Sequence, residues 1–582
     1  RGVKECVVVA RGEAGGQQKL VGYVVWEAGE AVGGEEVQRG LREVLPDYMV
    51  PTVYVEMERL PLTANGKVDR ERLPEPGESK LVMGVQYEAP RTAVEEQLAR
   101  IWAEVLEVER VGIHDDFFAL GGHSLLTVRL MTQIEKELGQ RLPVAAIFQC
   151  RTIEALAEML RRHTESSPWS SVVELRLPTV DLLAEAELDL ETCPEVWPGE
   201  LVSEPAHILL SGATGFLGVF LLHELLQQTA ADIYCLVRAA GIEEARRKLQ
   251  RTLEVSGLWQ PTYRDRIKPV VGDLARPLFG LSPAAFEELS CKLDVIYHNG
   301  ALVNMVYPYQ ELKAANVLGT KDILRLATHG KIKPLHYIST LSVFPHKDIT
   351  PIQFVREQES IDDYHEHVRG GYAQSKWVAE KLVTIARSRG LPVAIYRPGR
   401  ITGHSQTGAW RADDVLCRMI KGCIQLGSSP IFADDETLEM TPVDYVSQAI
   451  VALARRKAAL GQSFHLLNPV VANVNELVGW INAFGYPVRQ APYEQWLREL
   501  KLVAESPASN ELSPFLSMLP RKAQEEQPTE QVVKVLYDNR NSRLGLASTD
   551  ITCPPVDAEL VHTYLSYMVR SGFLPAPQEA AA

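Results

Sequence analysis

Tyr372 and Lys376 are the first two residues whose types and spacing could do chemistry. They open a stretch with helical spacing that runs on to Ala386, so both side chains lie on one helix face. An ammonium group beside a phenol favours the phenolate, and we expect it to lower the phenol pKa from about 10. Tyr372 would then be a usable general acid. Such pairs also occur on ordinary amphipathic helices, so the neighbouring elements decide their meaning.

Hydroxyl groups follow a predicted strand shortly before this helix. The segment Tyr337–Val343 contains Ser339, Thr340 and Ser342. Because parallel strands bind ligands at their carboxyl ends, we expect these hydroxyls at the same sheet edge as Tyr372.

A glycine-rich turn, Ser211–Gly218, lies between a predicted strand and the helix predicted over Val219–Leu226. Its glycines allow a tight turn and a close approach of backbone N–H groups to a pyrophosphate, and the helix N-terminus adds a positive dipole. This context predicts a dinucleotide site, although a purely structural turn is the alternative. The predicted cofactor contacts are Gly212, Thr214, Gly215, Phe216, Leu217 and Gly218.

The ends of the next two predicted strands indicate which cofactor binds. Enzymes that prefer NAD usually place an acidic residue where this chain has Arg238. Arg238, with Lys248, fits a 2′-phosphate and favours NADPH, although an arginine at a strand end is often only a surface charge. Asp273, followed by Leu274, could accept a hydrogen bond from the adenine amine, or it could cap a turn or helix.

Residues 181–403 are predicted to form a doubly wound α/β domain that positions these groups, and residues 404–582 a mostly helical substrate-binding part. Buried-strand patterns alternate there with helical stretches. The predicted strands are Ile208–Leu210, Ile233–Val237, Lys268–Val271, Val295–His298, Leu335–Ser339 and Val393–Tyr396.

Two smaller units precede this domain. Residues 1–76 are predicted to be an α+β unit with strands at Cys6–Ala10, Leu20–Trp26 and Val53–Met57, a helix near Glu35–Val44 and an Asn-Gly turn at 65–66. Residues 88–165 are predicted to be a four-helix bundle, followed by a linker over 166–180. The chain opens with Arg inside a strand-like run, so we expect it to be a piece of a longer protein.

Composition narrows the classes of partner. Of 582 residues, 75 are acidic and 60 are Lys or Arg, so the net charge is −15 and no basic run suggests nucleic-acid binding. No apolar stretch is long enough to span a membrane, and we expect a soluble cytoplasmic protein. The eight cysteines include no Cys-x-x-Cys pair, and no metal site is predicted.

The span from about 208 to 403 resembles the extended short-chain dehydrogenase/reductases. The resemblance rests on the glycine turn, the loop His298–Val303, Asn316, Thr340, the Tyr372–Lys376 pair and Arg397-Pro398-Gly399. It implies that Tyr372 donates a proton, that Lys376 tunes it and holds the nicotinamide ribose, and that Thr340, in place of the usual serine, orients the substrate carbonyl. Further cofactor contacts are expected at Gly300, Ala301, Leu302 and Pro398.

Two upstream motifs resemble parts of nonribosomal peptide synthetases. Asp115–Leu126 resembles the attachment site of a peptidyl carrier protein, where a phosphopantetheinyl transferase places 4′-phosphopantetheine on Ser124; a helix N-cap serine is the alternative for Gly-Gly-x-Ser alone. Leu60–Arg70 resembles the C-terminal subdomain of an adenylation domain, in which Lys67 would contact the carboxyl and phosphate groups. The ATP loop of that family is absent from this chain, so we expect no adenylation by it.

Together these resemblances imply a terminal thioester reductase domain that follows upstream synthetase domains. We expect NADPH-dependent reduction of a carrier-bound peptidyl or aminoacyl thioester to a thiohemiacetal, which collapses to an aldehyde and the free carrier thiol. A second round would give an alcohol, and the sequence leaves that step and the acyl group open. The alternatives are a carboxylic acid or aminoadipate reductase with the same domain order, or a redox-inactive cyclase or scaffold.

Overall fold

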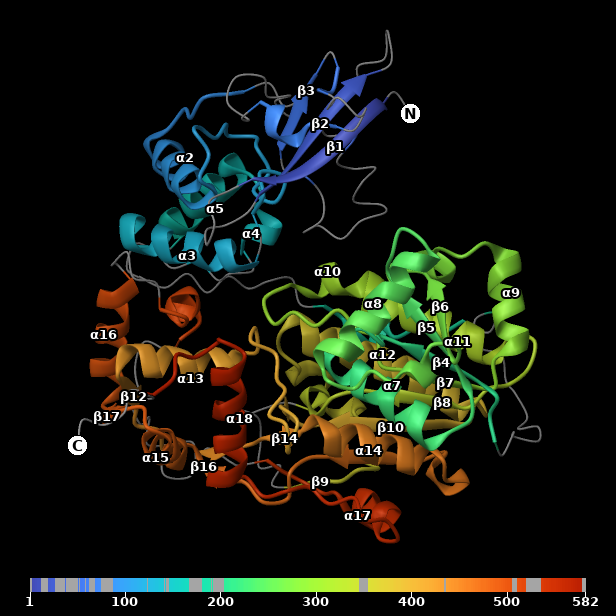
Figure 1. Ribbon diagram of the computed structural model, residues 1–582. Helices are drawn as coiled ribbons and strands as arrows, with labels where there is room; N and C mark the ends of the chain where they lie inside the picture. The colour runs from blue at the N-terminus through green and yellow to red at the C-terminus, as the bar shows by residue number, and fades with distance from the viewer. Residues whose placement is uncertain are drawn as a thin grey trace. The chain divides into compact units, whose positions relative to one another are not determined.

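The computed structural model divides into two compact units, residues 1–176 and 177–582, which we describe separately (Figure 1). The predicted helix at 35–44, apart from residue 37, the turn at 65–66, Lys67 and residues 167–179 of the predicted linker lie outside the described residues. The structure describes residues 3–11, 19–26, 37, 51, 53–57, 59–61, 68–74, 87–122, 124–140, 142, 146–166, 180–189, 191, 204–344, 354–433, 436–504, 510–519 and 535–577.

The first unit contains a small sheet and a helical bundle. In the sheet, β1 (Val3–Arg11) pairs antiparallel with β2 (Lys19–Trp26), and β2 pairs parallel with β3 (Val53–Glu56). The bundle has its own apolar core, which includes the buried rings of Trp102 and Phe117. Its helices are α2 (Ala93–Leu106), α3 (Ser124–Leu138), α4 (Ala146–Gln149) and α5 (Ile153–Ser166).

A seven-stranded, all-parallel sheet forms the centre of the second unit, in the order β15-β10-β8-β7-β4-β5-β6. The six predicted strands are all present. They are β4 (His207–Ser211), β5 (Asp232–Val237), β6 (Ile267–Val271), β7 (Val295–His298), β8 (Leu335–Ile338) and β10 (Val393–Pro398). The seventh strand, β15 (Ser463–Leu466), was not predicted and lies beyond the expected boundary at 403. The sheet therefore continues into the part of the chain assigned to substrate binding.

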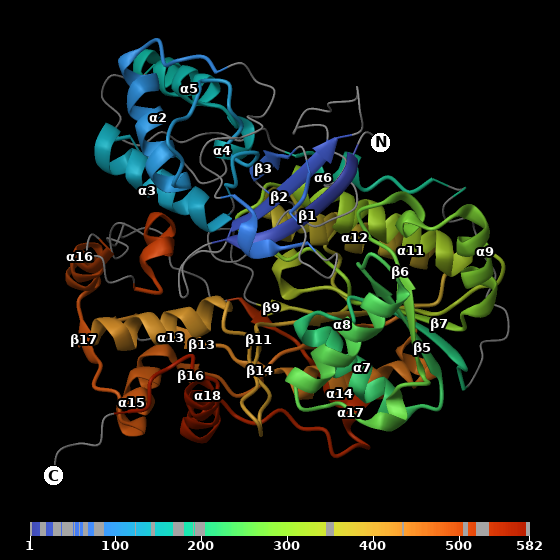
Figure 2. The same cartoon turned by 45° about the horizontal axis from the view of Figure 1, so that its top comes forward.

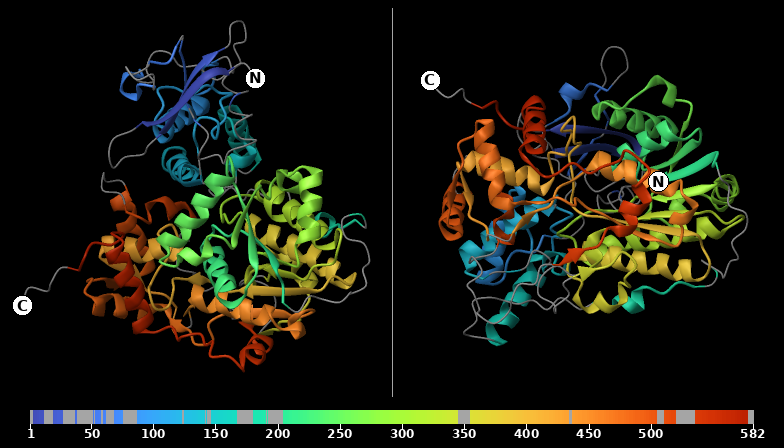
Figure 3. Two further views of the ribbon diagram at one scale, coloured as in Figure 1. Left: turned by 45° about the vertical axis from the view of Figure 1, so that its right-hand side comes forward. Right: turned by 90° about the horizontal axis from the view of Figure 1, so that it is seen from below.

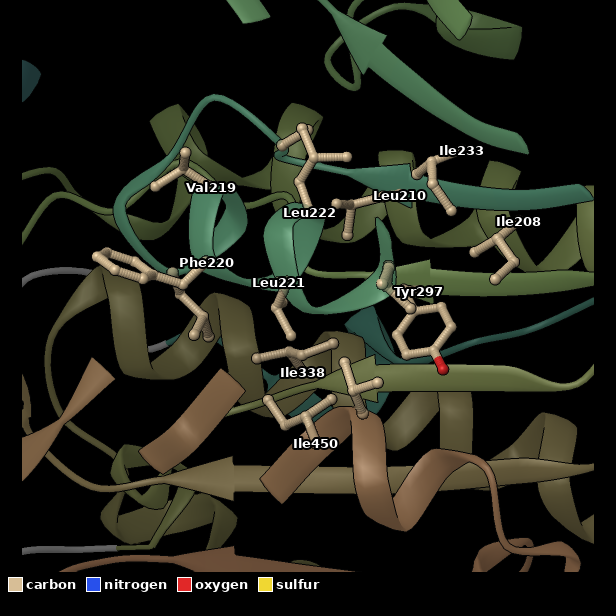
Figure 4. Packing of buried hydrophobic residues seen from close by; sticks show 14 of the residues in the cluster. Ile208, Leu210, Val219, Phe220, Leu221, Leu222, Ile233, Tyr297, Ile338 and Ile450 are labelled. Atoms are coloured by element: carbon tan, nitrogen blue, oxygen red, sulfur yellow. The ribbon is translucent and has the colours of Figure 1, made fainter. Parts of the chain in front are cut away.

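Helices cover both faces of this sheet (Figure 2). One face carries α9 (Pro283–Lys292), α11 (Gly319–Thr328) and α12 (Gly371–Ser388). The other carries α7 (Phe216–Gln228), α8 (Ile242–Val255), α14 (Val443–Ala454) and α17 (Arg540–Leu546). Figure 4 shows this second core, in which Leu221 of α7 and Ile450 of α14 lie near Ile338 of β8. Burial of both faces explains why the strands are nearly continuous apolar runs.

A separate apolar core joins the helices of the C-terminal part. In Figures 1 and 3 these orange and red helices gather beside the sheet. They are α13 (Val415–Leu426), α15 (Val474–Phe484), α16 (Tyr493–Ala504) and α18 (Ala558–Arg570). The predicted fold class, a carrier bundle with a Rossmann-type reductase and a mostly helical C-terminal part, is confirmed. No helix in the described parts of the chain is both long and apolar enough to cross a membrane.

A short lead-in helix, α6 (Leu182–Glu185), packs against the second unit just after the predicted linker. The carboxylate of Glu185 accepts hydrogen bonds from the Tyr309 hydroxyl at 2.9 Å and from the Lys313 ammonium at 3.0 Å. Both partners lie on α10 (Tyr309–Lys313). The guanidinium of Arg389 donates to the backbone carbonyls of Leu188 and Asp189. The lead-in is therefore tied to the sheet domain at two places.

Three strands of the sheet carry a buried histidine. His298 of β7, His336 of β8 and His465 of β15 are at most 2% exposed. Burial penalises the charged imidazolium, and the pKa of each falls from 6.5 to about 3. All three are therefore neutral at neutral pH.

We predict that this makes the protein sensitive to acid. Between the unfolded pKa of 6.5 and the folded pKa of about 3, the unfolded chain binds protons that the folded chain does not, so the free energy of unfolding falls as the pH falls. His336→Gln should reduce the slope of that fall by up to about 1.4 kcal/mol per pH unit, a value reached only once the pH is well below 6.5. Urea unfolding between pH 7.5 and 5 measures the slope. Equal slopes in His336→Gln and wild type would contradict the prediction.

Candidate functional site

The glycine turn connects β4 to α7 and has no room for larger side chains. Gly212 has a φ of +71°, in the left-handed region that favours glycine. A Cβ on Gly218 would lie 1.9 Å from the Gly212 carbonyl oxygen, and one on Gly212 would lie 2.7 Å from Cα of Gly300. The N-cap residue of α7, Gly215, provides no side-chain cap, so the first N–H groups of the helix are free of a capping side chain. This cradle fits a pyrophosphate.

Hydrogen bonds fix the turn to the loop that follows β7. The Ser211 hydroxyl lies 2.7 Å from Nδ1 of His298 and accepts from the Gly300 backbone N–H at 2.9 Å. Nε2 of His298 lies 3.0 Å from the Thr320 hydroxyl. Because Thr320 donates to a backbone carbonyl, neutral His298 donates from Nε2 and accepts at Nδ1. These polar contacts lie in the interior between β4, β7 and α11.

Asn316 connects the same loop to the helix that carries the Tyr-Lys pair. It lies in a single π-helical turn, η5 (Ala314–Leu318), between α10 and α11. Its side chain accepts from the Leu302 N–H at 2.7 Å, donates to the Leu302 carbonyl at 3.1 Å and donates to the Ser375 hydroxyl at 2.9 Å. Ser375 in turn donates to the backbone carbonyl of Tyr372 at 2.8 Å. One amide side chain therefore fixes the spacing between the loop and α12.

The predicted cofactor residues all follow or flank the carboxyl ends of parallel strands. Arg238 comes directly after β5 and is exposed. Lys248, on α8, donates to the Arg238 carbonyl at 2.9 Å and pairs with Glu244 at 2.7 Å. Asp273 accepts a hydrogen bond from the Ala275 N–H at 3.0 Å. In this structure its side chain therefore caps a turn, which is one of the two roles predicted for it.

The remaining predicted contacts lie along the same edge. Leu274 packs against Gly300, whose Cβ would lie 2.6 Å from the leucine side chain. Ala301 and Leu302 continue that loop after β7, and Pro398 is the last residue of β10. Thr214, Phe216 and Leu217 belong to the turn and the first turn of α7.

Lys376, one helical turn after Tyr372 on α12, contacts the end of β8, two residues before Thr340. The Lys376 ammonium donates to the Ile338 carbonyl at 2.8 Å and lies 4.5 Å above the ring centre of Tyr337. Thr340 follows two residues after Ile338, and its hydroxyl accepts from the Ser342 N–H at 3.2 Å. The lysine therefore contacts the strand end that carries the threonine.

The expected lowering of the Tyr372 pKa is wrong for this structure. Withdrawal of the phenol from water raises the pKa of Tyr372 to about 12, because the phenolate loses hydration. Burial also lowers the pKa of Lys376 to about 7, although the nearby carboxylate of Glu380 opposes that shift. The helical spacing places both residues on one face, but the ammonium bonds to a backbone carbonyl. The phenol of Tyr372 therefore stays protonated at neutral pH.

The carrier motif lies at the start of α3. The structure describes the backbone of Ser124 at the first position of this helix. Gly122 explains part of the motif, because its Cβ would lie 2.5 Å from the Phe117 carbonyl oxygen and closer still to the Phe117 ring. Asp116 accepts from the N–H groups of Phe118 and Ala119 at 2.8 and 2.9 Å. The glycine and the aspartate therefore shape the loop that leads to Ser124.

A parallel seven-stranded sheet with this turn and a Tyr-Lys helix defines an NAD(P)H-dependent reductase of the Rossmann type. The solved terminal R domain from the myxalamid PKS-NRPS pathway is 48% identical, with a TM-score of 0.62, and the match covers 68% of this chain and 99% of that domain. The chain belongs to this family, the terminal reductase domains of nonribosomal peptide synthetases.

Other comparisons agree with the domain order. Family models match at residues 1–67 (AMP-binding enzyme C-terminal domain), 96–160 (phosphopantetheine attachment site) and 210–450 (an NAD-binding family described as male sterility protein). A solved thiolation-reductase di-domain from an archaeal synthetase is 25% identical, with a TM-score of 0.63, over 84% of this chain and all of that one.

Curated relatives are longer than this chain. A linear gramicidin synthase protein of Brevibacillus parabrevis is 40% identical over 99% of the chain, which spans 11% of that protein. An L-2-aminoadipate reductase of Penicillium chrysogenum is 34% identical over 94% of the chain, which spans 42% of that protein. The chain thus spans less than half the length of both.

Several polar residues that support the site could not be found from the sequence. Local spacing carries no signal for Ser211, Thr320 and Ser375, because each acts through a partner far away in sequence. The same holds for Glu380 and Arg397, which form a buried ion pair of 2.6 Å between α12 and β10. Arg397 stood out only as part of the Arg-Pro-Gly motif.

We predict that Gly218→Ala destroys the cofactor cradle. The added methyl group would overlap the Gly212 carbonyl, and overpacking of this kind costs about 1–3 kcal/mol. NADPH binding, measured by fluorescence titration, should weaken at least tenfold, by about 1.4 kcal/mol or more. The control is Gly479→Ala, where a Cβ meets nothing within 4 Å and binding should be unchanged. Wild-type affinity in Gly218→Ala would contradict the assignment.

Proposed function

We propose that this chain releases an acyl or peptidyl group from its own carrier domain by NADPH-dependent reduction of the thioester to an aldehyde. The observation that carries the proposal is the junction of β8 and α12, where Lys376 contacts the strand end that bears Thr340, one helical turn after Tyr372. It lies in the same chain as a phosphopantetheine attachment domain. A reductase site and a thioester carrier are therefore joined covalently.

The chain's own residues would perform the following chemistry. Bound NADPH supplies a hydride to the thioester carbonyl carbon. Thr340 orients that carbonyl, and Tyr372 donates its phenolic proton to the oxygen, which gives a thiohemiacetal. The carbon–sulfur bond then breaks, and the hydroxyl proton passes to the sulfur, leaving an aldehyde and the carrier thiol. Lys376 would tune the phenol electrostatically and hold the nicotinamide ribose.

NADPH is proposed over NADH because the residue after β5 is the exposed Arg238 and not an acidic residue. Gly212, Thr214, Gly215, Phe216, Leu217 and Gly218 would hold the pyrophosphate, and Arg238 with Lys248 the 2′-phosphate. Asp273, Leu274, Gly300, Ala301, Leu302 and Pro398 would line the rest of the cofactor site. Ser124 would receive 4′-phosphopantetheine from a phosphopantetheinyl transferase, and upstream synthetase domains would load the arm.

The likeness to L-2-aminoadipate reductases favours a second candidate function, in which the carrier holds a single amino acid instead of a peptide. The reductive step is the same in both. A condensation domain ahead of this segment would favour the peptide-releasing function, because such a domain is expected only there.

The release reaction is testable on the full chain. After a phosphopantetheinyl transferase has transferred acyl-phosphopantetheine from acyl-coenzyme A, Ser124 should carry the added mass in intact-protein mass spectrometry. NADPH should then remove the acyl group as an aldehyde. We expect Tyr372→Phe to retain loading, folding and NADPH binding but to lose at least about 100-fold in rate, because proton donation is removed. Ser124→Ala should fail to load and should still oxidise NADPH with free acyl-pantetheine thioesters. Full activity in Tyr372→Phe would overturn the mechanism.

We predict that Arg238→Ala mainly weakens NADPH. Loss of one charge-assisted hydrogen bond should raise the KM for NADPH about 10- to 100-fold and leave the KM for NADH unchanged. Arg251→Ala, an exposed arginine near the other end of α8, is the matched control. The cofactor assignment fails if NADH serves the wild-type protein as well as NADPH does.

A further inference from the structure

A buried carboxylate lies one helical turn beyond the Tyr-Lys pair. Tyr372, Lys376 and Glu380 follow one another at intervals of four on α12, so their side chains lie along one face of the helix. Glu380 is 0% exposed and Lys376 is 4% exposed. A buried carboxylate is costly unless it is paired and hydrogen-bonded, so its partners indicate its purpose.

Both oxygens of Glu380 are occupied. Oε1 accepts from Nη2 of Arg397 at 2.6 Å and from Nε at 3.0 Å. Oε2 accepts from the Ser339 hydroxyl. Ser339 lies between Ile338, whose carbonyl binds Lys376, and Thr340. Two side chains of α12 thus grip consecutive residues at the end of β8.

Arg397 extends this contact to other elements. Its Nη1 donates to the Glu357 carbonyl at 3.0 Å and lies 3.2 Å from Nε2 of His465. His465 is neutral, since burial and the adjacent guanidinium lower its pKa to about 3. The carboxylate of Glu357 is occupied by the Ser542 hydroxyl at 2.7 Å and by backbone N–H groups. Glu380 is therefore the carboxylate that directly pairs with Arg397 among the described residues.

Among the described residues around Lys376, Glu380 supplies the negative charge that stabilises the lysine ammonium. The ammonium faces the neutral His298 of β7 and the ring of Tyr337 on β8. The cation that pairs with Glu380 is the guanidinium of Arg397. The titratable and charged groups facing the pair are Tyr372 and Arg387 of α12, His298, Tyr337, Arg397, His465 and Glu357.

We propose that Glu380 is a positioning residue of the reductase site, which clamps the strand end carrying Thr340 and supplies the counter-charge beside Lys376. This inference rests on the proposed function, because it concerns the same site. Glu380 raises the pKa of Lys376 against the lowering by burial. Without it, the lysine loses its proton at lower pH, and the end of β8 that carries Thr340 loses one of its two hydrogen bonds to α12.

The test is Glu380→Gln in the full chain, assayed by NADPH oxidation with glycyl-, alanyl- and octanoyl-pantetheine thioesters. We expect kcat to fall at least about tenfold, which is less than the full effect of removing a positioned proton donor. The KM for NADPH should change little. The high-pH limb of kcat/KM should move to lower pH, since the lysine is charged below its pKa and neutral above it. A merely structural role would not move this limb.

The matched control is Glu357→Gln. Glu357 is also buried, at 1% exposure, and belongs to the same network, but it lies on the far side of Arg397 and contacts neither Lys376 nor the end of β8. This variant should lose thermal stability without moving the pH limb. An equal pH shift in both variants, or a folded Glu380→Gln with the wild-type rate and pH profile, would overturn the proposal.

Ser339→Ala decides the matter if Glu380→Gln does not fold. It leaves both charges in place and removes only the hydrogen bond to Oε2. We expect kcat to fall about threefold or more, which corresponds to the loss of one hydrogen bond. The high-pH limb should stay where it is in the wild-type protein. An unchanged kcat would overturn the clamp. If the wild-type protein itself oxidises no NADPH with any thioester while binding NADPH, the proposed function fails, and that outcome is distinct from failure of the variants.

Discussion

A series of hydrogen bonds joins the glycine turn to α12, the helix with the Tyr-Lys pair, and the geometry of the candidate site depends on it. It runs from Ser211 through His298, Thr320 and Asn316 to Ser375, which binds the Tyr372 carbonyl. The first four links pass from one element to the next, from β4 to β7, α11, η5 and α12, and the last lies within α12. Because parallel strands end at one edge, the elements that follow them must be held at fixed spacing, and buried polar pairs do this with direction as well as distance.

This series of hydrogen bonds requires the imidazole of His298 to be neutral. A protonated His298 would have two donors, and the Ser211 hydroxyl, which already accepts from Gly300, would have to reverse its bond. Burial keeps the imidazole neutral. The same low-dielectric interior makes Lys376 easy to deprotonate, so one environment favours the structural histidine and opposes the charge of the lysine. The carboxylate of Glu380 opposes this effect on the lysine, because its negative charge raises the pKa of Lys376.

Much of the fold could be predicted from the sequence because its signals are local. Fully buried parallel strands are apolar runs, and glycines mark the turn where a Cβ would collide with backbone. The strand Ser463–Leu466 escapes prediction because it is four residues long and contains Ser463 and His465, so it lacks that run. The direction of the Tyr372 pKa shift could not be predicted, because spacing along a helix does not show that the ammonium reaches the Ile338 carbonyl. The Glu380–Arg397 pair needs tertiary contact to be recognised at all.

The late arrival of β15 has a consequence for how the reductase can be divided. The chain leaves the sheet after β10, contributes α13 to the helical core, and returns through α14 and β15. It then leaves again for α15 and α16, returns to the sheet face as α17, and rejoins the helical core as α18. The segments that build the helical core are thus interrupted along the chain by segments of the sheet domain. A chimera made by a single cut at residue 403 would remove an edge strand and the imidazole beside Arg397. Exchange of substrate-binding parts between such reductases therefore requires the helices of the C-terminal core to be replaced while α14, β15 and α17, which belong to the sheet domain, are kept.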